Sequence, residues 1–187
     1  MGTETVCRNN RTEGGKTMIL FSAIFPDEAV KDVCTALQDQ LKEQTEGSYP
    51  VRENLHVTTF YFGETTDETA ARIQAILAAH PIPEMKIMLD HIHRFGGPSG
   101  GHIVYAGTNN EALHAWRKET ADVFAAEGIA YSPEVFLPHI TLVRAKQHPV
   151  RFLPDHVPVM TSSASVHVLL ESLQIAGKRV YRPFAGD

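Results

Sequence analysis

The sequence is poor in cysteine and has neither a long apolar run nor an excess of positive charge. Its two cysteines are Cys7, in a polar leader, and Cys34, on the apolar face of a predicted helix. Two cysteines in such places exclude a disulfide framework and indicate a reducing compartment. No stretch is apolar enough to span a membrane, and residues 1–17 contain no hydrophobic run of the kind found in secretory signals. We therefore expect a cytoplasmic protein with no membrane partner.

The net charge of −5 argues against a broad surface for binding nucleic acid. Charge is nevertheless uneven along the chain. Residues 1–93 hold eight Lys and Arg against fourteen Asp and Glu, whereas the segment from Arg144 to the C-terminus holds six against three. This distribution predicts a local positive patch near Arg144, sufficient for a short ligand that carries phosphate but not for tight binding of a duplex.

A P-loop for binding phosphate is also absent, although residues 96–101 read GGPSGG. Neither a lysine nor a helix follows these residues, and a P-loop requires both. The segment is typical of the loop in a β-hairpin, which is the structure we expect there.

The sequence does contain two copies of one short pattern: His56 with Thr58 in LHVTT, and His139 with Thr141 in PHITL. A spacing of two residues sends both side chains to one face of a β-strand. Two such strands facing each other would supply an acid, a base and two hydrogen-bond donors around one small anion. Those groups are sufficient to cleave a phosphodiester without a metal ion.

An internal repeat supports this interpretation. The number of motifs alone does not support it, because chance gives about one His-x-Thr triplet in a chain of this composition. The interval from His56 to His139 is nearly equal to the interval between two apolar segments, one starting at Met18 and the other at His102. Both segments lead through a turn and an amphipathic helical pattern to the strand with the motif, so the two halves read as copies of one β-α-β unit.

Helical spacing of apolar residues is clear over residues 30–41 and less regular over residues 113–127. Thr65 with Glu68 predicts a capping box for a further helix in the first half, whereas three prolines exclude a long helix from its counterpart around residues 147–163. We predict an α+β fold with two pseudo-symmetric, interlocked β-α-β lobes, with antiparallel sheets around a central cleft and helices on the outer faces. Residues 1–17 are expected to form a flexible tail, and residues 18–187 a single bilobal domain.

The pair of motifs and the segments around them resemble the 2H phosphoesterase superfamily, and more narrowly its RNA 2′,3′-cyclic phosphodiesterases, which are also named 2′-5′ RNA ligases. The segments that carry the resemblance are LFSAIFPDE, NLHVTTFYFGE and FLPHITLVRAK. The resemblance covers residues 18–184. Its more specific part is the second motif, where Pro138, His139, Thr141 and Arg144 stand in the order typical of the family.

The resemblance implies an enzyme that opens the 2′,3′-cyclic phosphate of an RNA end or nucleotide with water, leaving a 2′-phosphate. In that role His139 accepts the proton of water and His56 donates a proton to the departing 3′ oxygen. Thr58 and Thr141 would donate hydrogen bonds to the non-bridging oxygens. No metal or other cofactor is implied, and we expect a monomer.

Three further residues are candidates for contact with the substrate. Arg144 could bind phosphate, or it could instead pair with an acidic side chain on the surface. Among the aromatic residues near the predicted cleft, most should belong to the core, and Phe60 and Tyr105 are the candidates for stacking on a base.

Each of these interpretations has an alternative. A histidine within an apolar strand is often a core residue, and threonine is a good strand former in its own right. His91 and His93 alternate on one strand and could bind a metal, but spacing places no third ligand beside them. The same site could catalyse 2′-5′ ligation or act on another cyclic or 2′-5′ linked nucleotide, and a module that binds RNA without catalysis is an alternative of a different class.

Overall fold

The structure of the chain is a computed structural model, which describes residues 17–96, 102–146, 160–163 and 166–185. The helices are α1 (Glu28–Lys42), α2 (Asp67–Ala79), α3 (Glu111–Ala126) and the short 3₁₀ turn η1 (Arg52–Asn54). The strands before α3 are β1 (Thr17–Ile24), β2 (Gly47–Ser48), β3 (Val57–Thr66), β4 (Lys86–Leu89), β5 (His91–Phe95) and β6 (His102–Gly107). Those after it are β7 (His139–Ala145), β8 (Met160–Ser163), β9 (His167–Ile175) and β10 (Lys178–Pro183). Of the predicted tail over residues 1–17, only Thr17 lies within the described residues, and it begins β1.

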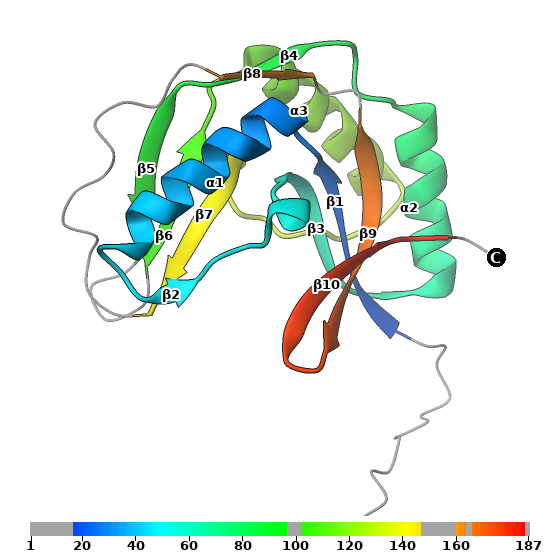
Figure 1. The fold of residues 1–187 in the computed structure, drawn as a ribbon. Coiled ribbons are helices and arrows are strands. Elements are labelled where there is room, and N and C mark those ends of the chain that lie inside the picture. Colours follow the sequence, from blue (N-terminus) through cyan, green and yellow to red (C-terminus); the bar gives the residue numbers. More distant parts are fainter. Residues whose placement is uncertain (1–16, 97–101, 147–159, 164–165, 186–187) are drawn as a thin grey trace, which may run out of the picture.

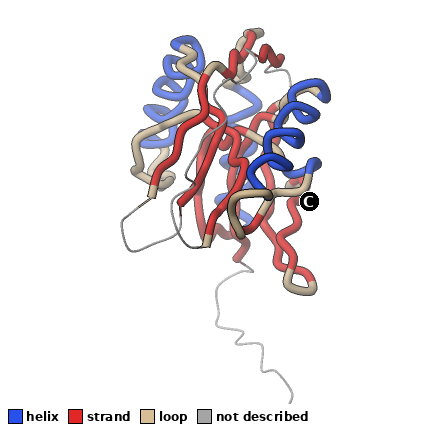
Figure 2. The backbone as a smooth tube through the Cα atoms, turned by 60° about the vertical axis from the view of Figure 1, so that its left-hand side comes forward, coloured by secondary structure: helices blue, strands red, loops and turns tan. Residues whose placement is uncertain are grey.

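The main sheet has the order β10-β9-β1-β3-β7-β6-β5, with β2 attached to β7, and every pairing in it is antiparallel. Its centre is narrow, because β3 and β7 pair through one residue pair, Val57 with Ile140. The sheet therefore consists of a first half-sheet (β10, β9, β1 and β3) and a second half-sheet (β7, β6, β5 and β2). Strands β4 and β8 form a small second sheet. The predicted α+β fold is confirmed, with strands lying between helices (Figures 1 and 2).

The predicted repeat is visible in this order, since β1-α1-β3 corresponds to β6-α3-β7 and the final strands β5 and β9 correspond to each other. Each final strand, however, pairs with the half-sheet of the other repeat. Strand β5 of the first repeat lies beside β6, and β9 of the second repeat lies beside β1. Helices are exchanged in the same way: α1 packs against β7 (Figure 1), and Trp116 of α3 contacts Phe60 of β3. This exchange is what interlocks the lobes.

Local sequence features explain where the helices begin and what they bury. Helix α1 buries Val30, Cys34, Leu37 and Leu41, as its spacing predicts. Asn110 caps α3, because its side chain accepts a hydrogen bond from the backbone of Leu113 at 2.8 Å. The capping box predicted at Thr65 is wrong by one residue: β3 continues through Thr65, and the side chain of Thr66 caps α2 instead.

Two other expectations concern loops and membranes. Strands β5 and β6 pair antiparallel up to Phe95 and Ile103, so the predicted hairpin is present, although its loop over residues 97–101 lies outside the described residues. The segment 147–159, where prolines exclude a long helix, also lies outside them, and β8 follows it. Among the helices in the described part of the chain, none is long and apolar enough to cross a membrane.

Both strands that carry a motif contain a β-bulge one residue after the motif threonine. Ser22 and Ala23 of β1 pair with Phe60 and Thr58, so Thr59 is the extra residue in β3. Val104 and Tyr105 of β6 pair with Val143 and Thr141, so Leu142 is the extra residue in β7. Since each bulge directly follows its motif, the two bulges occupy equivalent places in the repeat.

The carbonyl of each bulge residue accepts a hydrogen bond from a long side chain on a helix of the other repeat. Gln38 of α1 donates to the carbonyl of Leu142 at 3.0 Å, and also to that of Pro50 at 2.9 Å. Arg117 of α3 donates through Nε to the carbonyl of Thr59 at 2.6 Å. Because a buried carbonyl without a partner costs free energy, these two buried polar side chains stabilise the bulges.

Replacing Gln38 by Leu should therefore lower the free energy of unfolding by about 1–3 kcal/mol, since the buried carbonyl of Leu142 loses its side-chain donor. Urea denaturation measures this change. Gln40→Leu is the matched control, because Gln40 is exposed on the same helix and its replacement leaves the bulge intact. Equal stability of the two variants would contradict the role given to Gln38.

Candidate active site

The two motifs meet at the junction between the half-sheets. His56 directly precedes β3 and His139 opens β7, one residue away from the pair Val57 and Ile140. In both motifs the histidine and the threonine are half-buried, while the residue between them is fully buried. The predicted alternation is therefore present: each His and Thr share one face of the sheet, and the apolar residue between them faces the core.

Each imidazole is held by a backbone carbonyl two residues earlier in the chain. Nδ1 of His56 lies 2.6 Å from the carbonyl oxygen of Asn54, and Nδ1 of His139 lies 2.6 Å from that of Leu137. A carbonyl only accepts hydrogen bonds, so Nδ1 of both rings carries the proton and Nε2 of the neutral ring is an acceptor. The hydroxyl of Thr58 donates to Nε2 of His56 at 3.1 Å.

Aromatic rings flank both imidazoles. Phe21 and Tyr181 have ring centroids 5.3 Å from that of His56, with Tyr181 nearly perpendicular to it. On the other side, Tyr105 and Phe95 lie 5.0 and 5.3 Å from His139. Tyr105, a predicted substrate contact, is thus a neighbour of His139. Its ring is only 8% exposed, so most of its surface is used in packing.

Burial and neighbouring positive charge favour the neutral form of both histidines. The pKa of His56 is lowered to about 4, mainly by burial; the hydrogen bond to Asn54 opposes this shift, and charges on His139 and Arg144 add to it. The pKa of His139 is also lowered, by burial and by the charge of Arg144, against the effect of its bond to Leu137. Arg144 and both imidazoles therefore lie within electrostatic reach of one another.

A cleft of about 740 Å³ opens beside these groups. His56, Thr141 and Arg144 line it, together with the loop before His56, the turn between β9 and β10, and the first residues of β10. A smaller adjoining cleft of about 390 Å³ shares His56 and Arg144 and is also lined by Thr58. Lys178 and Arg179 add positive charge to the larger cleft. The positive patch predicted near Arg144 is thus part of the cleft wall.

The bulges decide which residue follows each threonine into the cleft. Because one extra residue is inserted, two consecutive side chains after each threonine are buried, and the third emerges on the side of the motif. In the second half-sheet this third residue is Arg144, and in the first it is Tyr61, which is 47% exposed and lines the smaller cleft. Tyr61 was not predicted, although it is the counterpart of Arg144 in the repeat, and that equivalence could have indicated it.

The structure contradicts the predicted contact of Phe60 with substrate. Strict alternation would place Phe60 on the face of His56 and Thr58, but the bulge at Thr59 turns its ring into the core, where it is 1% exposed. There the guanidinium of Arg117 lies 3.5 Å from the ring centroid, and Phe124 packs edge-on at 4.8 Å.

The metal alternative at His91 and His93 gains no further ligand. Nδ1 of His91 is 2.6 Å from a carboxylate oxygen of Asp90, and Nδ1 of His93 is 2.9 Å from the carbonyl oxygen of Arg94. Over the part of the chain that the structure describes, no three His, Cys, Asp or Glu side chains are grouped so that they could hold a metal ion. Metal independence of the reaction stays a prediction.

Comparisons with known proteins point to one family. A family model described as the 2′-5′ RNA ligase superfamily matches residues 25–173. A relative from Aeropyrum pernix, named RNA 2′,3′-cyclic phosphodiesterase, is 30% identical over 118 residues, which are 62% of this chain and 66% of the relative. A relative of the same name from Methanocaldococcus jannaschii is 31% identical over 131 residues, 69% of this chain and 72% of the relative. The chain thus spans about two thirds of the length of the relatives it matches.

Solved structures with the same fold include LigT of E. coli. Its apo form and its complex with 3′-AMP superpose on the chain with TM-scores of 0.76 and 0.75, at 20% sequence identity. The match covers 91% of this chain and 96–97% of LigT. At this identity the similarity establishes a shared fold, which agrees with the α+β architecture expected from the sequence.

Opposite effects are expected for substitutions at the neighbouring positions 60 and 61. Phe60→Leu should lower the free energy of unfolding by about 1–2 kcal/mol, through looser packing and lost aromatic contacts, without changing KM. Tyr61→Ala should leave stability nearly unchanged and raise KM for a 2′,3′-cyclic nucleotide about fivefold or more, if the exposed ring stacks on the base. Denaturation curves and steady-state kinetics on both variants check this. An increased KM for Phe60→Leu alone would mean that the position of the bulge is wrong.

Proposed function

Because the chain belongs to the 2′-5′ RNA ligase superfamily, we propose that it hydrolyses the 2′,3′-cyclic phosphate of RNA ends or nucleotides to a 2′-phosphate, without a metal ion. The observation that carries this proposal is the site itself. Two imidazoles, each with Nδ1 bonded to a backbone carbonyl, stand on strands that pair with each other, next to a cleft with Arg144 in its wall. The names of the two relatives support the same reaction.

The reaction is an in-line displacement at phosphorus. Nε2 of neutral His139 accepts a proton from water as the water oxygen forms its bond to phosphorus. The bond from phosphorus to the 3′ oxygen breaks, and His56, protonated on Nε2, donates its proton to that oxygen. General acid and base catalysis typically contributes about 10²- to 10⁴-fold. The assignment of acid and base to particular histidines follows the family, because the two motifs are equivalent in sequence.

Charge on the phosphate is stabilised by the groups around it. Thr58 and Thr141 donate hydrogen bonds to the non-bridging oxygens, whose negative charge grows in the transition state. Arg144 adds a charge-assisted contact, and its guanidinium is available on the cleft wall. Lys178 and Arg179 extend the positive surface of the same cleft, so that further phosphates of an RNA strand would find cations there.

Ligation of 2′-5′ ends is a second candidate, favoured by the description of the family. In ligation a 5′ hydroxyl takes the place of water: His139 accepts its proton as its oxygen bonds to phosphorus, the bond from phosphorus to the 3′ oxygen breaks, and His56 protonates that oxygen. A panel of substrates with defined ends separates hydrolysis from ligation. A location in the cytoplasm and a monomeric state also stay predictions.

His56→Ala and His139→Ala should each lower kcat on a 2′,3′-cyclic nucleotide by about 10²-fold or more, since each removes one proton transfer. The assay contains EDTA, so that wild-type turnover in it also tests metal independence. His80→Ala is the control, because His80 is an exposed histidine at the end of α2. Circular dichroism establishes that the variants remain folded.

Activity of both folded variants near the wild-type level would refute the mechanism. Loss of wild-type turnover in EDTA, with recovery on adding zinc, would refute metal independence. The loss of activity in the histidine variants would then be explained by loss of zinc ligands. Binding of the nucleotide without turnover by the wild-type protein would favour a module that binds RNA.

The pH dependence should be bell-shaped, with its maximum in different places for kcat/KM and kcat. In the free enzyme the pKa values of both histidines are lowered, so the maximum of kcat/KM should lie below pH 6.5. Activity is lost at low pH as His139 becomes protonated, and at higher pH as His56 loses its proton. A bound phosphate anion raises both pKa values, so the maximum of kcat should lie at higher pH. Monotonic profiles would contradict a pair of histidines in opposite protonation states.

A further inference from the structure

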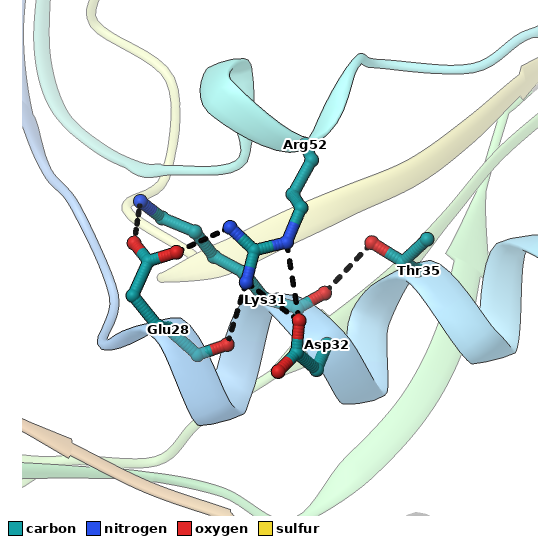
Figure 3. Close-up of polar contacts among 5 residues, drawn as sticks. All are labelled: Glu28, Lys31, Asp32, Thr35 and Arg52. Carbon is teal, nitrogen blue, oxygen red and sulfur yellow. Dashed lines mark hydrogen bonds and ion pairs between the residues drawn. The ribbon is translucent and has the colours of Figure 1, made fainter.

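Arg52 connects the loop in front of His56 to helix α1. Its guanidinium donates to the carboxylates of Glu28 and Asp32 on successive turns of the helix (Figure 3). Nη2 lies 2.5 Å from Oδ1 of Asp32, and Nε lies 3.1 Å from the same oxygen. Nη2 also donates to the backbone carbonyl of Glu28 at 3.3 Å. One side chain is thus fixed in a single orientation by several hydrogen bonds.

The carboxylate of Glu28 is shared with a second cation, Lys31, whose ammonium lies 2.7 Å from it. The hydrogen bonds from Lys31 and Arg52 lower the pKa of Glu28 to about 2, so the carboxylate is charged over the whole range in which the enzyme would be assayed. Arg52 keeps its charge as well, since its pKa is raised by Asp32 and Glu28. The group formed by Arg52, Glu28, Asp32 and Lys31 is called the Arg52 cluster below.

The 3₁₀ turn η1 transmits this attachment to His56. Arg52 opens the turn and Asn54 ends it, and the backbone of Asn54 donates to the carbonyl of Val51 at 2.8 Å. The backbone carbonyl of Asn54 is the acceptor for Nδ1 of His56. The side-chain amide of Asn54 donates to the backbone carbonyl of Arg179 in β10 at 3.3 Å. The turn is therefore fixed to α1 at one end and to the β9–β10 hairpin at the other, with the acceptor of the imidazole between them.

The loop before His139 is held in another way. Its carbonyl acceptor belongs to Leu137, and the preceding Phe136 lies under the guanidinium of Arg117, with the ring centroid 5.4 Å away. Arg117 is buried and Phe136 is partly buried, and this contact between a cation and a ring involves no carboxylate among the described residues. The side chain of Arg52, in contrast, is 34% exposed and its contacts are ionic. Salt should therefore weaken the support of His56 and leave that of His139 unchanged.

We propose that Arg52 is a positioning residue for His56, acting through the 3₁₀ turn to hold the carbonyl of Asn54 where it orients the imidazole. This inference rests on the proposed function, in which His56 is the general acid. The Arg52 cluster fixes both the ring position and the tautomer that leaves Nε2 directed at the substrate. Ion pairs on the surface contribute little to global stability, so the effect belongs to the geometry of His56.

Arg52→Gln should lower kcat by about 10- to 100-fold, because small displacements of a catalytic group cost rates of this size, with KM nearly unchanged. Arg52→Lys, which keeps the charge but not the planar fork, should recover part of the loss. Arg72→Gln is the matched control. Arg72 lies on the surface of α2 and donates to the side-chain carboxylate and the backbone carbonyl of Glu127, which follows α3. Its replacement should leave kcat at the wild-type level while lowering thermal stability as much as Arg52→Gln does.

A second measurement is independent of turnover. In ¹⁵N NMR at neutral pH, His56 of the wild-type protein should show a single tautomer, protonated on Nδ1. Arg52→Gln should show a mixture of tautomers for His56, with His139 unchanged. In wild type, rising salt should lower kcat and broaden the same His56 signals, and Arg52→Gln should have lost this sensitivity.

Combining the substitution with His56→Ala separates the possible failures. If Arg52 acts through His56, the double variant has the residual activity of His56→Ala alone. A further loss of the same factor in the double variant, or an unchanged tautomer in Arg52→Gln, would overturn the inference and leave the proposed function intact. Full activity of His56→Ala would instead overturn the proposed function, and the tautomer of His56 would still report whether Arg52 orients the ring.

Discussion

The single pairing of Val57 with Ile140 is the contact on which the site depends. With one pair, the half-sheets share a narrow centre, and the residues on either side of that pair are His56, Thr58, His139 and Thr141. The apolar residue inside each HxT motif is therefore a structural requirement: Val57 and Ile140 face the core, and their neighbours His56, Thr58 and Thr141 line the clefts.

Sequence reasoning predicted that the two motifs lie on equivalent strands, because the information for this prediction is local. The spacing of His and Thr, and the recurrence of that spacing in the second half of the chain, needed only the period of a strand. It failed at the bulges. Nothing in the residues around Thr59 or Leu142 marks an insertion, because a bulge arises from the register of the partner strand and from a helix side chain that satisfies the freed carbonyl. The bulge at Thr59 buried Phe60 and exposed Tyr61, and the bulge at Leu142 brought Arg144 to the motif face, where simple alternation would not have placed it.

The repeat predicted two lobes but not how they are joined. Either repeat could have kept its own final strand and helix, and the periodicity of the chain would have been identical. The exchange of β5 and β9 is determined by tertiary contacts, since each of these strands pairs with an edge of the other repeat's half-sheet. It gives each half-sheet contributions from both repeats, and Gln38 and Arg117 extend the exchange to the bulges. Neither repeat therefore forms a complete lobe alone.

Departures from symmetry distinguish the two histidines. The surroundings of His56 are more enclosed, since Phe25 lies near its ring in addition to Phe21 and Tyr181, and its pKa is lowered to about 4. With such a pKa, His56 is neutral in the free protein at neutral pH. In the proposed mechanism it acquires its proton together with the phosphate anion and then gives that proton to the departing oxygen, because the site disfavours the charged ring once the phosphate charge is redistributed. The proposed acid works only if its Nε2 is already aimed at the substrate, and the carbonyl of Asn54, which holds Nδ1 at 2.6 Å, is the contact that fixes the ring in that orientation.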